Sequence, residues 1–541
     1  MKNKIIIIYI LMFISNYGKG QSWQWSKHLG SSYQFFGERA NNVFCDGNDI
    51  YLVGSYGGTL YFPADSLSSN GFNDIFIAKF NQNGDLIWFR SIGSTSMSPG
   101  ELEDGRGALD TVNHWFYVSG SIYGIVDFGN GVILNTGTTG NVDSFIAKYD
   151  SSGQCQWAKL IGSPGYDYAH CFVQPDSKVL VAGKLADNGY VDTLAVNAGG
   201  FFARFDSGGN LLWAEHKFSG PEEYKIDISF IGNDIIMTGS FNNNTCFIDT
   251  SNLILTGTTN GFLTRLDSTG HVKWINTFNG PGVNTGYGTR TDQLSNIYVT
   301  GTFQDSTQLG SMKLYDTDQD FYLAKFDGNG GVIWGAQANC DGSIAAGLSI
   351  VIDNDGNPVV IGTFNGNAHF GSFSINTTNQ YDMFITKYDN NGACVGIRNF
   401  GTASGFALAI NENNDEICSG VFWNTVNIGG TSLTALFAQD IFLAKCDEIV
   451  GIEEERQSID QLKIYSNPNN GTCILEIPDD FINDKNALIS IYDSNGKMVK
   501  QQTLNLYNSK YQLNIEMKAK GIYNVILSNR FKNYYGRIVF E

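Results

Sequence analysis

The chain has 541 residues, of which 42% are hydrophobic, 13% aromatic and only 16% charged. This composition can build hydrophobic cores, which excludes a globally disordered chain, and the 63 glycines follow no every-third pattern, which excludes collagen. The net charge of −19 is concentrated in residues 21–455, where 20 Lys and Arg stand against 45 Asp and Glu. Such an acidic body repels nucleic acids and anionic lipids, so we expect neither as a partner.

The N-terminus has the features of a signal peptide. Lys2 and Lys4 form a positive region, and the apolar run 5–14 that follows is too short to cross a bilayer comfortably. Gly18 and Gly20 place small residues before Gln21, so we expect residues 1–20 to be removed. The alternative is an uncleaved anchor, which would need a longer apolar run. We expect a mature chain without a membrane span.

A repeated phrase dominates the middle of the chain. The motif is aromatic-x-Ala/Thr-Lys/Arg-x-Asp/Asn-x-x-Gly, and a Trp usually follows about four residues later. Residues of period two flank a turn of Asn, Asp, Ser or Gly, which predicts a β-hairpin. A second hairpin recurs, for example at 43–54, 292–301 and 352–362, so each repeat holds four strands, a to d. The phrases begin at Phe76, Phe145, Phe201, Phe262, Tyr322, Phe384 and Phe442.

Four-stranded units repeated around an axis form the blades of a β-propeller, with strand a at the axis and strand d outside. Seven copies of strands a to c occur, and the seventh lacks strand d. The missing strand lies at the other end of the chain, because residues 25–30 match 88–93 and 157–162. We therefore predict an all-β fold with a seven-bladed β-propeller over residues 21–447. The N-terminal strand would close the ring and leave no open edge.

The phrase is similar to that of the secreted bacterial β-propeller repeat family, over about residues 22–447. The resemblance concerns the fold rather than a function. We expect the repeated lysines, such as Lys79, Lys148 and Lys325, to hold their ammonium groups in water. The turn aspartates are expected to cap their turns: Asp150, Asp206, Asp267, Asp327 and Asp389. The tryptophans are expected to pack between blades: Trp25, Trp88, Trp157, Trp213, Trp274 and Trp334.

The composition changes after Asp447. Residues 448–461 are predicted to be a charged linker, and the short alternating strands of 462–541 predict a small immunoglobulin-like β-sandwich. This segment resembles the type A C-terminal sorting domain of the type IX secretion system, although Ser466 stands where the usual motif has Pro. The matching residues are Tyr465, Asn467, Pro468, Gly471, Gly496, Lys497, Gly521 and Tyr523.

The resemblance implies export in two steps from a Gram-negative bacterium. The signal peptide crosses the inner membrane, and the outer-membrane type IX secretion machinery then recognises the C-terminal domain. The protein would be secreted or held on the outer cell surface. The alternative is an immunoglobulin-like module that stays attached to the working protein.

The sequence carries no recognisable catalytic motif. The histidines form no H-E-x-x-H pair, and no serine has glycines at both −2 and +2. Asp206 and Trp213 are seven residues apart, a spacing similar to that of quinoprotein propeller repeats, and we interpret it as blade packing. The strand-a stretches offer carboxylates that are scattered in register: Asp110, Asp167, Asp227, Asp292 and Asp353.

Two acidic loops offer carboxylates that can converge on Ca²⁺, although neither has the spacing of an EF-hand. A solvated turn is the alternative that we favour, and we predict no other metal or cofactor. The nine cysteines show no C-x-x-C pair or zinc pattern. Cys418 and Cys446 lie on neighbouring predicted strands, where one disulfide is conceivable, but we do not predict it. The candidate calcium ligands are Asp316, Asp318, Asp320, Asp353 and Asp355.

Three functional hypotheses remain, and we adopt the first. It is a secreted or surface-exposed scaffold without chemistry of its own, which binds a glycan or protein through its long b–c loops. Those loops include 58–73, 123–142 and 242–259. Their aromatic residues Tyr61, Phe62 and Tyr123 could stack on sugars or cover blade edges, and we favour the second role. The second is a polysaccharide-active or other hydrolytic enzyme with its site at the propeller channel. The third is a structural surface-layer component.

Overall fold

The computed structural model divides the chain into two compact units, Met1–Val450 and Gly451–Glu541. The predicted signal peptide and most of the predicted linker lie outside the described residues. No helix in the described part of the chain has the length and apolar character needed to cross a membrane. The structure describes residues 22–32, 38–63, 65–71, 73–94, 105–137, 142–219, 226–243, 246–340, 344–377, 379–449, 462–468, 471–478, 481–482, 487–493, 497–514, 520–529 and 533–540.

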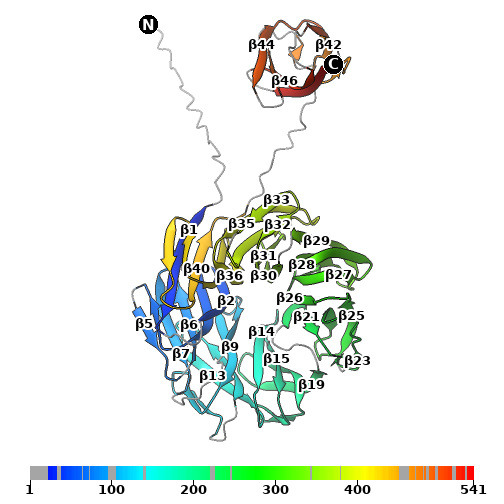
Figure 1. Cartoon of the computed structure of the whole chain (residues 1–541). Coiled ribbons are helices and arrows are strands. Elements are labelled where there is room, and N and C mark those ends of the chain that lie inside the picture. The colour runs from blue at the N-terminus through cyan, green and yellow to red at the C-terminus, as the bar shows by residue number, and fades with distance from the viewer. Residues whose placement is uncertain are drawn as a thin grey trace, which may run out of the picture. The chain divides into compact units, whose positions relative to one another are not determined.

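The first unit is a ring of antiparallel sheets around a common axis (Figure 1). Seven sheets of its described residues contain four strands in the order a, b, c, d, and we number them as blades 1 to 7 in the order of their a strands. Strands a are β2 (Arg39–Asp46), β8 (Arg106–Asp110), β14 (Tyr168–Val173), β20 (Asp227–Ile231), β26 (Asn284–Thr291), β30 (Ala345–Ile352) and β36 (Ala403–Ile410). Strands b are β3 (Asp49–Tyr56), β9 (Trp115–Ile122), β15 (Val179–Leu185), β21 (Asp234–Phe241), β27 (Ile297–Leu309), β31 (Pro358–Phe364) and β37 (Glu416–Phe422).

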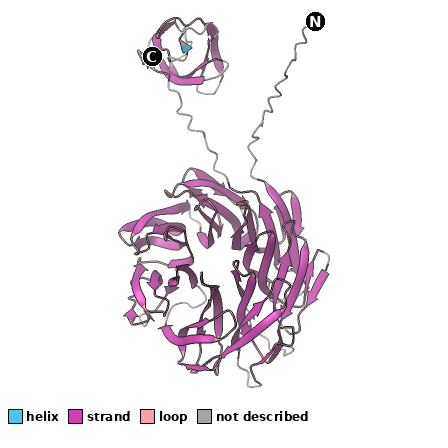
Figure 2. Cartoon of the chain, turned by 180° about the vertical axis from the view of Figure 1, so that it is seen from behind, coloured by secondary structure: helices cyan, strands magenta, loops and turns pink. Residues whose placement is uncertain are grey.

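The outer half of each blade consists of strands c and d. Figure 2 shows that strands build the ring throughout. Strands c are β6 (Asp74–Phe80), β12 (Asp143–Tyr149), β18 (Gly199–Phe205), β24 (Asn260–Leu266), β28 (Met312–Phe326), β34 (Asp382–Tyr388) and β40 (Asp440–Cys446). Strands d are β7 (Leu86–Ile92), β13 (Cys155–Gly162), β19 (Leu211–Ser219), β25 (Val272–Phe278), β29 (Val332–Cys340), β35 (Cys394–Phe400) and β1 (Trp23–Ser31).

Hydrophobic packing between blades explains the apolar sequences of the strands. Seven clusters of buried side chains each join one pair of adjacent blades, including the pair formed by blades 7 and 1. Strands such as β6, β12, β34 and β40 are buried at every residue, because neighbouring blades cover both faces. Continuous apolar runs rather than strict alternation are therefore expected in strands c.

The ring is closed by the N-terminal strand. β1 pairs with β40 in an antiparallel ladder that runs from Trp23 opposite Cys446 to Leu29 opposite Ile441. Strand d of blade 7 therefore comes from the opposite end of the propeller sequence. This pairing, together with the blade architecture, confirms the predicted all-β propeller closed by its N-terminal strand.

The b–c connections form small hairpins at the rim. Several of them pair with strand d of the preceding blade and extend its sheet to six strands. In blade 5 the hairpin is a continuation of β27 and β28. The other hairpins are β4 (Thr59–Phe62) with β5 (Asp65–Ser68), β10 (Ile125–Asp127) with β11 (Ile133–Asn135), β16 (Gly189–Val191) with β17 (Leu194–Val196), β22 (Phe247–Ile248) with β23 (Ser251–Asn252), β32 (Asn367–Phe370) with β33 (Phe373–Asn376), and β38 (Thr425–Ile428) with β39 (Thr431–Thr434).

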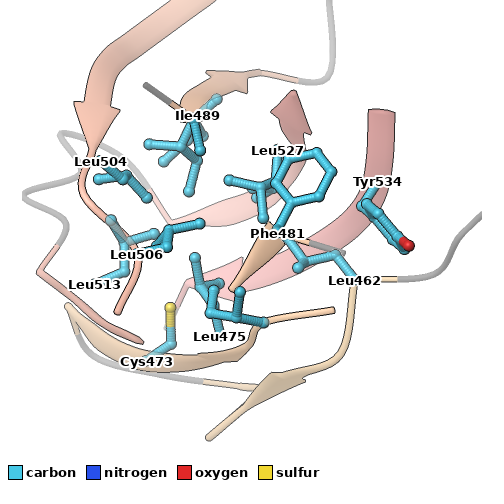
Figure 3. Close-up of a cluster of buried hydrophobic side chains, with 14 of the residues drawn as sticks. Leu462, Cys473, Leu475, Phe481, Ile489, Leu504, Leu506, Leu513, Leu527 and Tyr534 are labelled. Atoms are coloured by element: carbon cyan, nitrogen blue, oxygen red, sulfur yellow. The ribbon is translucent and has the colours of Figure 1, made fainter. Parts of the chain in front are cut away.

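The second unit is a small sandwich of two antiparallel sheets, as predicted. Side chains such as Leu475, Phe481, Ile489 and Leu527 fill the space between the sheets (Figure 3). One sheet has the order β41 (Ile464–Tyr465), β42 (Thr472–Glu476), β45 (Lys510–Asn514). The other has the order β44 (Met498–Leu504), β43 (Ala487–Tyr492), β46 (Gly521–Ser528), β47 (Asn533–Phe540).

Candidate functional site

A large cavity lies where the ring closes, between blades 7 and 1. It has a volume of about 850 Å³, and we call it the seam cleft. Strand β1 contributes one side, hairpin strand β4 another, and the b–c loop of blade 7 a third. Its lining residues are Ser26, Lys27, His28, Gly30, Ser32, Tyr61, Phe62, Pro63, Leu436 and Phe437.

The walls of the seam cleft are mostly apolar and accessible. The exposed fractions are 45% for Tyr61, 50% for Leu436 and 43% for Phe437, which is high for large hydrophobic residues. Phe62 is instead buried and stacks on Phe89 at 5.1 Å between ring centroids, so it supports the wall. Of the aromatic loop residues named from the sequence, Tyr61 is thus exposed in the seam cleft. Tyr123 is half-buried and does not line this cleft.

A buried carboxylate orients one polar side chain of the seam cleft. His28 Nε2 lies 2.6 Å from Asp440 Oδ2, and the backbone N–H of Leu436 donates to the same oxygen at 2.7 Å. Asp440 is fully buried, so it fixes both the imidazole and the loop that carries Phe437. A Cβ at Gly30 would lie 2.6 Å from Asp440 Oδ2, so this pairing requires glycine there.

Glu38 is a further buried carboxyl group near Asp440. Burial raises the pKa of Glu38 to about 8, and the nearby Asp440 charge acts in the same direction. None of His28, Glu38, Asp440 or Phe437 was singled out from the sequence. The sequence could have indicated that His28 and Asp440 lie close together, because Asp440 begins strand c and His28 lies on the strand that completes the same blade.

The axial channel is a separate cavity of about 620 Å³ lined by residues of all seven strands a. Polar and apolar side chains share its described lining, with Phe44 and Phe172 beside Asp227 and Arg290. Asp227 accepts a hydrogen bond from Arg290 at 2.7 Å, and the Asp110 carboxylate accepts N–H groups of its own turn. The channel carboxylates are therefore already engaged.

The other carboxylates expected on strands a, Asp167, Asp292 and Asp353, do not line the axial channel. The Asp292 carboxylate accepts N–H groups of its own a–b turn. Asp353 Oδ2 lies 2.7 Å from Lys387 Nζ. Asp167 is buried and accepts hydrogen bonds from Ser163 and Ala186.

The six tryptophans predicted to pack between blades lie on strands d, and five of them donate a hydrogen bond to the c–d turn of the next blade. Trp88 Nε1 donates to Ser151 O at 3.1 Å, and a Cβ at Gly153 would lie 3.0 Å from its ring. The same bond joins Trp25 Nε1 to Gln82 O across the ring closure. Trp213 is half-buried in the cluster between blades 3 and 4. Equivalent bonds join Trp157 to Ser207, Trp274 to Gly328 and Trp334 to Asn390.

The expected turn caps are present. In each case one aspartate oxygen accepts the N–H groups two and four residues further along, as Asp150 does from Ser152 and Gln154. The glycine of the turn has a positive φ, 77° for Gly153, which favours glycine. The same pattern occurs at Asp206, Asp267, Asp327 and Asp389.

The expectation that the repeated lysines hold their ammonium groups in water is wrong. Lys79, Lys148 and Lys325 are buried. Lys79 Nζ lies 2.6 Å from Asp49 Oδ2 and donates to Ser151 O of the next blade at 3.2 Å. The position is sandwiched between blades, so its charge must be paired or hydrogen-bonded there.

The two acidic loops differ. Asp320 is fully buried, and burial followed by the neighbouring Asp316 raises its pKa to about 8. Asp353 and Asp355 lie with Glu448 in a group of carboxylates whose oxygens are within 4.8 Å of one another. Lys387 forms an ion pair with both Asp353 and Glu448, so a cation of the protein already occupies this group.

All nine cysteines are free thiols, so Cys418 and Cys446 do not form a disulfide. Both are buried, and burial raises the pKa of Cys418 and of Cys446 above the ordinary thiol range. They act as small apolar side chains in the core between blades 6 and 7.

The predicted sorting motif lies in the second unit. Asn467 precedes Pro468 across a cis peptide bond, and its side chain bonds the backbone of Arg537 and Val539 on β47. Tyr465 is exposed on β41 and donates to Glu476, whereas Tyr523 is buried in the core. Gly471, Lys497 and Gly521 are described at or beside strands, and Gly496 lies outside the described residues.

These features define the class: an all-β propeller followed by a small β-sandwich. Residues 463–541 match the family model described as "Secretion system C-terminal sorting domain". The chain is therefore a β-propeller protein with a type IX sorting domain, exported to the cell surface or extracellular space.

Other similarities extend over the propeller. An uncharacterized WD repeat-containing protein of Acanthamoeba polyphaga mimivirus is 26% identical over 423 residues, which covers 70% of this chain. The match spans only 28% of that relative. Among solved structures, the Dos1 propeller has a TM-score of 0.37 at 12% identity, covering 77% of this chain and 95% of that chain. A PL25 ulvan lyase has a TM-score of 0.27 at 10% identity, covering 91% and 97%.

Proposed function

We propose that this protein is an extracellular binding protein that recognises its ligand at the seam cleft and performs no chemistry of its own. The observation that carries the proposal is the accessible apolar wall of Tyr61, Leu436 and Phe437 in a cavity of about 850 Å³. Cavities of this size with mostly apolar walls and few polar groups are typical ligand sites. The propeller would be the working body, and the second unit would serve export.

The polar groups of the seam cleft are already engaged within the protein. His28 is tied to Asp440, and the Lys27 ammonium lies 3.4 Å from Asp85 Oδ1. A hydrolase at the axial channel would need an acid and a base free to exchange protons with a substrate. The bonds of Asp227 and Asp110 instead support a structural role for the channel carboxylates.

Binding and turnover can be measured on the same sample. The purified exported protein is incubated with extracellular polysaccharides and with proteins, and both retention and product formation are recorded. We expect retention without new reducing ends or peptide fragments, and loss of retention in the double variant Tyr61→Ser, Phe437→Ser. Product formation by the wild-type protein would contradict the proposal, whether or not it survives the double variant.

The chain offers a matched control for the aromatic wall. Tyr190 on β16 pairs with Gly162 of strand d, as Tyr61 on β4 pairs with Gly30. Tyr190 is also well exposed but lies outside the seam cleft. Tyr190→Ser should therefore leave retention unchanged.

A further inference from the structure

We infer that the seam cleft takes an extended peptide segment, which adds a strand to the open outer edge of β1. The inference rests on the proposed function and names the chemical class of the ligand. A cleft lined by Ser26, Lys27 and His28 in succession follows the edge of a strand, because alternate side chains point to opposite faces. The groups at a strand edge are backbone N–H and C=O.

The register identifies which backbone groups face this edge. β4 pairs with β1 only at Gly30 and Ser31, and Ser32 N donates to Thr59 O beyond them. In an antiparallel ladder, alternate residues bond to the same neighbour. The backbone groups of Ser26 and His28 therefore point outward like those of Gly30, and no described backbone strand pairs with them.

Pro63 explains why the ladder stops here. It follows Phe62 at the tip of the hairpin and stands where the next donor to β1 would be, opposite His28. The equivalent tip residues of blades 3 and 4 are Asp192 and Asp249. Their N–H groups donate to Leu160 O at 2.9 Å and to Lys217 O at 2.6 Å on the preceding strand d. Proline has no N–H, so the hairpin cannot donate to the His28 carbonyl in blade 7, and no donor to it occurs among the described backbone groups.

The open edge continues an established ladder and is flanked by an apolar wall. An incoming segment would extend the line of β4, antiparallel to β1, with its main chain bonded to His28 and Ser26. Tyr61, Leu436 and Phe437 would receive one or two of its apolar side chains. Main-chain pairing with side-chain pockets is the way exposed sheet edges capture peptides. A saccharide could stack on Tyr61 but would leave the row of backbone groups unmatched.

The test uses a phage-displayed library of random twelve-residue peptides panned on the purified exported protein. Selected peptides are resynthesised, and their dissociation constants are measured on wild-type protein and on Pro63→Asp. Pro63→Asp introduces the residue found at positions 192 and 249, so it supplies the N–H donor that the hairpin lacks opposite the His28 carbonyl. We expect it to weaken binding by about tenfold or more, and Tyr190→Ser to change it less than about twofold.

A second measurement on wild-type protein does not depend on any variant folding. When peptides are methylated at one backbone nitrogen at a time, their affinity should fall about tenfold at every second residue. At the residues between, the affinity should change little. Uniform tolerance of methylation, equal binding to Pro63→Asp, or no peptide bound below about 100 µM would each overturn the inference. Saccharide binding that is lost in Tyr61→Ser would overturn the peptide assignment but leave the proposed function standing. Turnover that survives the loss of the cleft would overturn the proposed function itself.

Discussion

Asp320 gives a prediction about pH that can be worked out from its surroundings. The side chain is fully buried in blade 5, beside the Asp316 carboxyl group and the Cys340 thiol. Burial, with the carboxylates of Asp316 and Asp318 nearby, raises its pKa to about 8. The folded protein therefore keeps a proton on Asp320 that the unfolded chain releases near pH 4.

This difference in bound protons gives the sign and the size of the pH dependence of the free energy of unfolding. Where the folded state binds more protons than the unfolded state, the free energy of unfolding falls as the pH rises. For Asp320 the fall begins near pH 4 and ends near pH 8, at about 1.4 kcal/mol per pH unit. Between pH 5 and 7 this amounts to about 2–3 kcal/mol.

The substitution Asp320→Asn keeps the shape of the side chain and cannot ionise. Melting temperatures measured by calorimetry from pH 5 to 8 should show the variant above wild type at pH 8 and close to it at pH 5. The pH dependence should shrink without disappearing, because burial also raises the pKa of Asp143 to about 7 and that of Glu38 to about 8.

Asp382 provides the matched control. It begins strand c of blade 6 and accepts hydrogen bonds from Thr402 N at 2.7 Å and Asn379 Nδ2 at 2.9 Å. Asp382→Asn removes a charged acceptor from both, so it should cost about 1–3 kcal/mol at every pH. If Asp320→Asn lowered the melting temperature at pH 8 as Asp382→Asn does, Asp320 would be ionised and paired, and the reasoning would be refuted.

Four further outcomes follow from the contacts described. Trp88→Ala should lower the free energy of unfolding by about 2–3 kcal/mol in denaturant titrations, because it removes the contact between blades 1 and 2. Arg398→Met should cost about 3–5 kcal/mol in the same titrations, because it leaves the buried Glu416 without its partner. Calcium and EDTA should leave the calorimetric melting temperature unchanged, because Lys387 already neutralises the acidic group around Asp353. Deletion of residues 463–541 should retain the protein in the periplasm, as judged by cell fractionation.

The propeller could be predicted because its determinants are local and repeated. Each hairpin carries its own turn chemistry, so the order of strands follows from the phrase itself. The displaced strand at Trp25 was found for the same reason, since it matches the residues around Trp88. A pattern that recurs along the chain remains visible even when its parts pair across more than 400 residues, as Trp25 and Lys445 do.

The seam cleft could not be predicted in this way. It combines His28, Tyr61 and Phe437 from three distant segments, and none of them departs from the pattern of a strand or loop in its own surroundings. The position of the Lys79 ammonium was missed for a related reason. Its charge is compensated by Asp49 in one blade and Ser151 in the next, and only the stacking of the blades brings them together.

The repeats also provide an internal standard against which single residues can be judged. Asp192, Asp249 and Pro63 occupy the same position of three hairpins, and two of them donate the bond that the third cannot. Since the architecture tolerates aspartate there, proline is not required by the fold. A departure that leaves a ladder unfinished beside an accessible aromatic wall has a structural consequence that blades 3 and 4 avoid. In a repeat protein such departures, more than the repeated residues themselves, indicate where a function has been placed on the common scaffold.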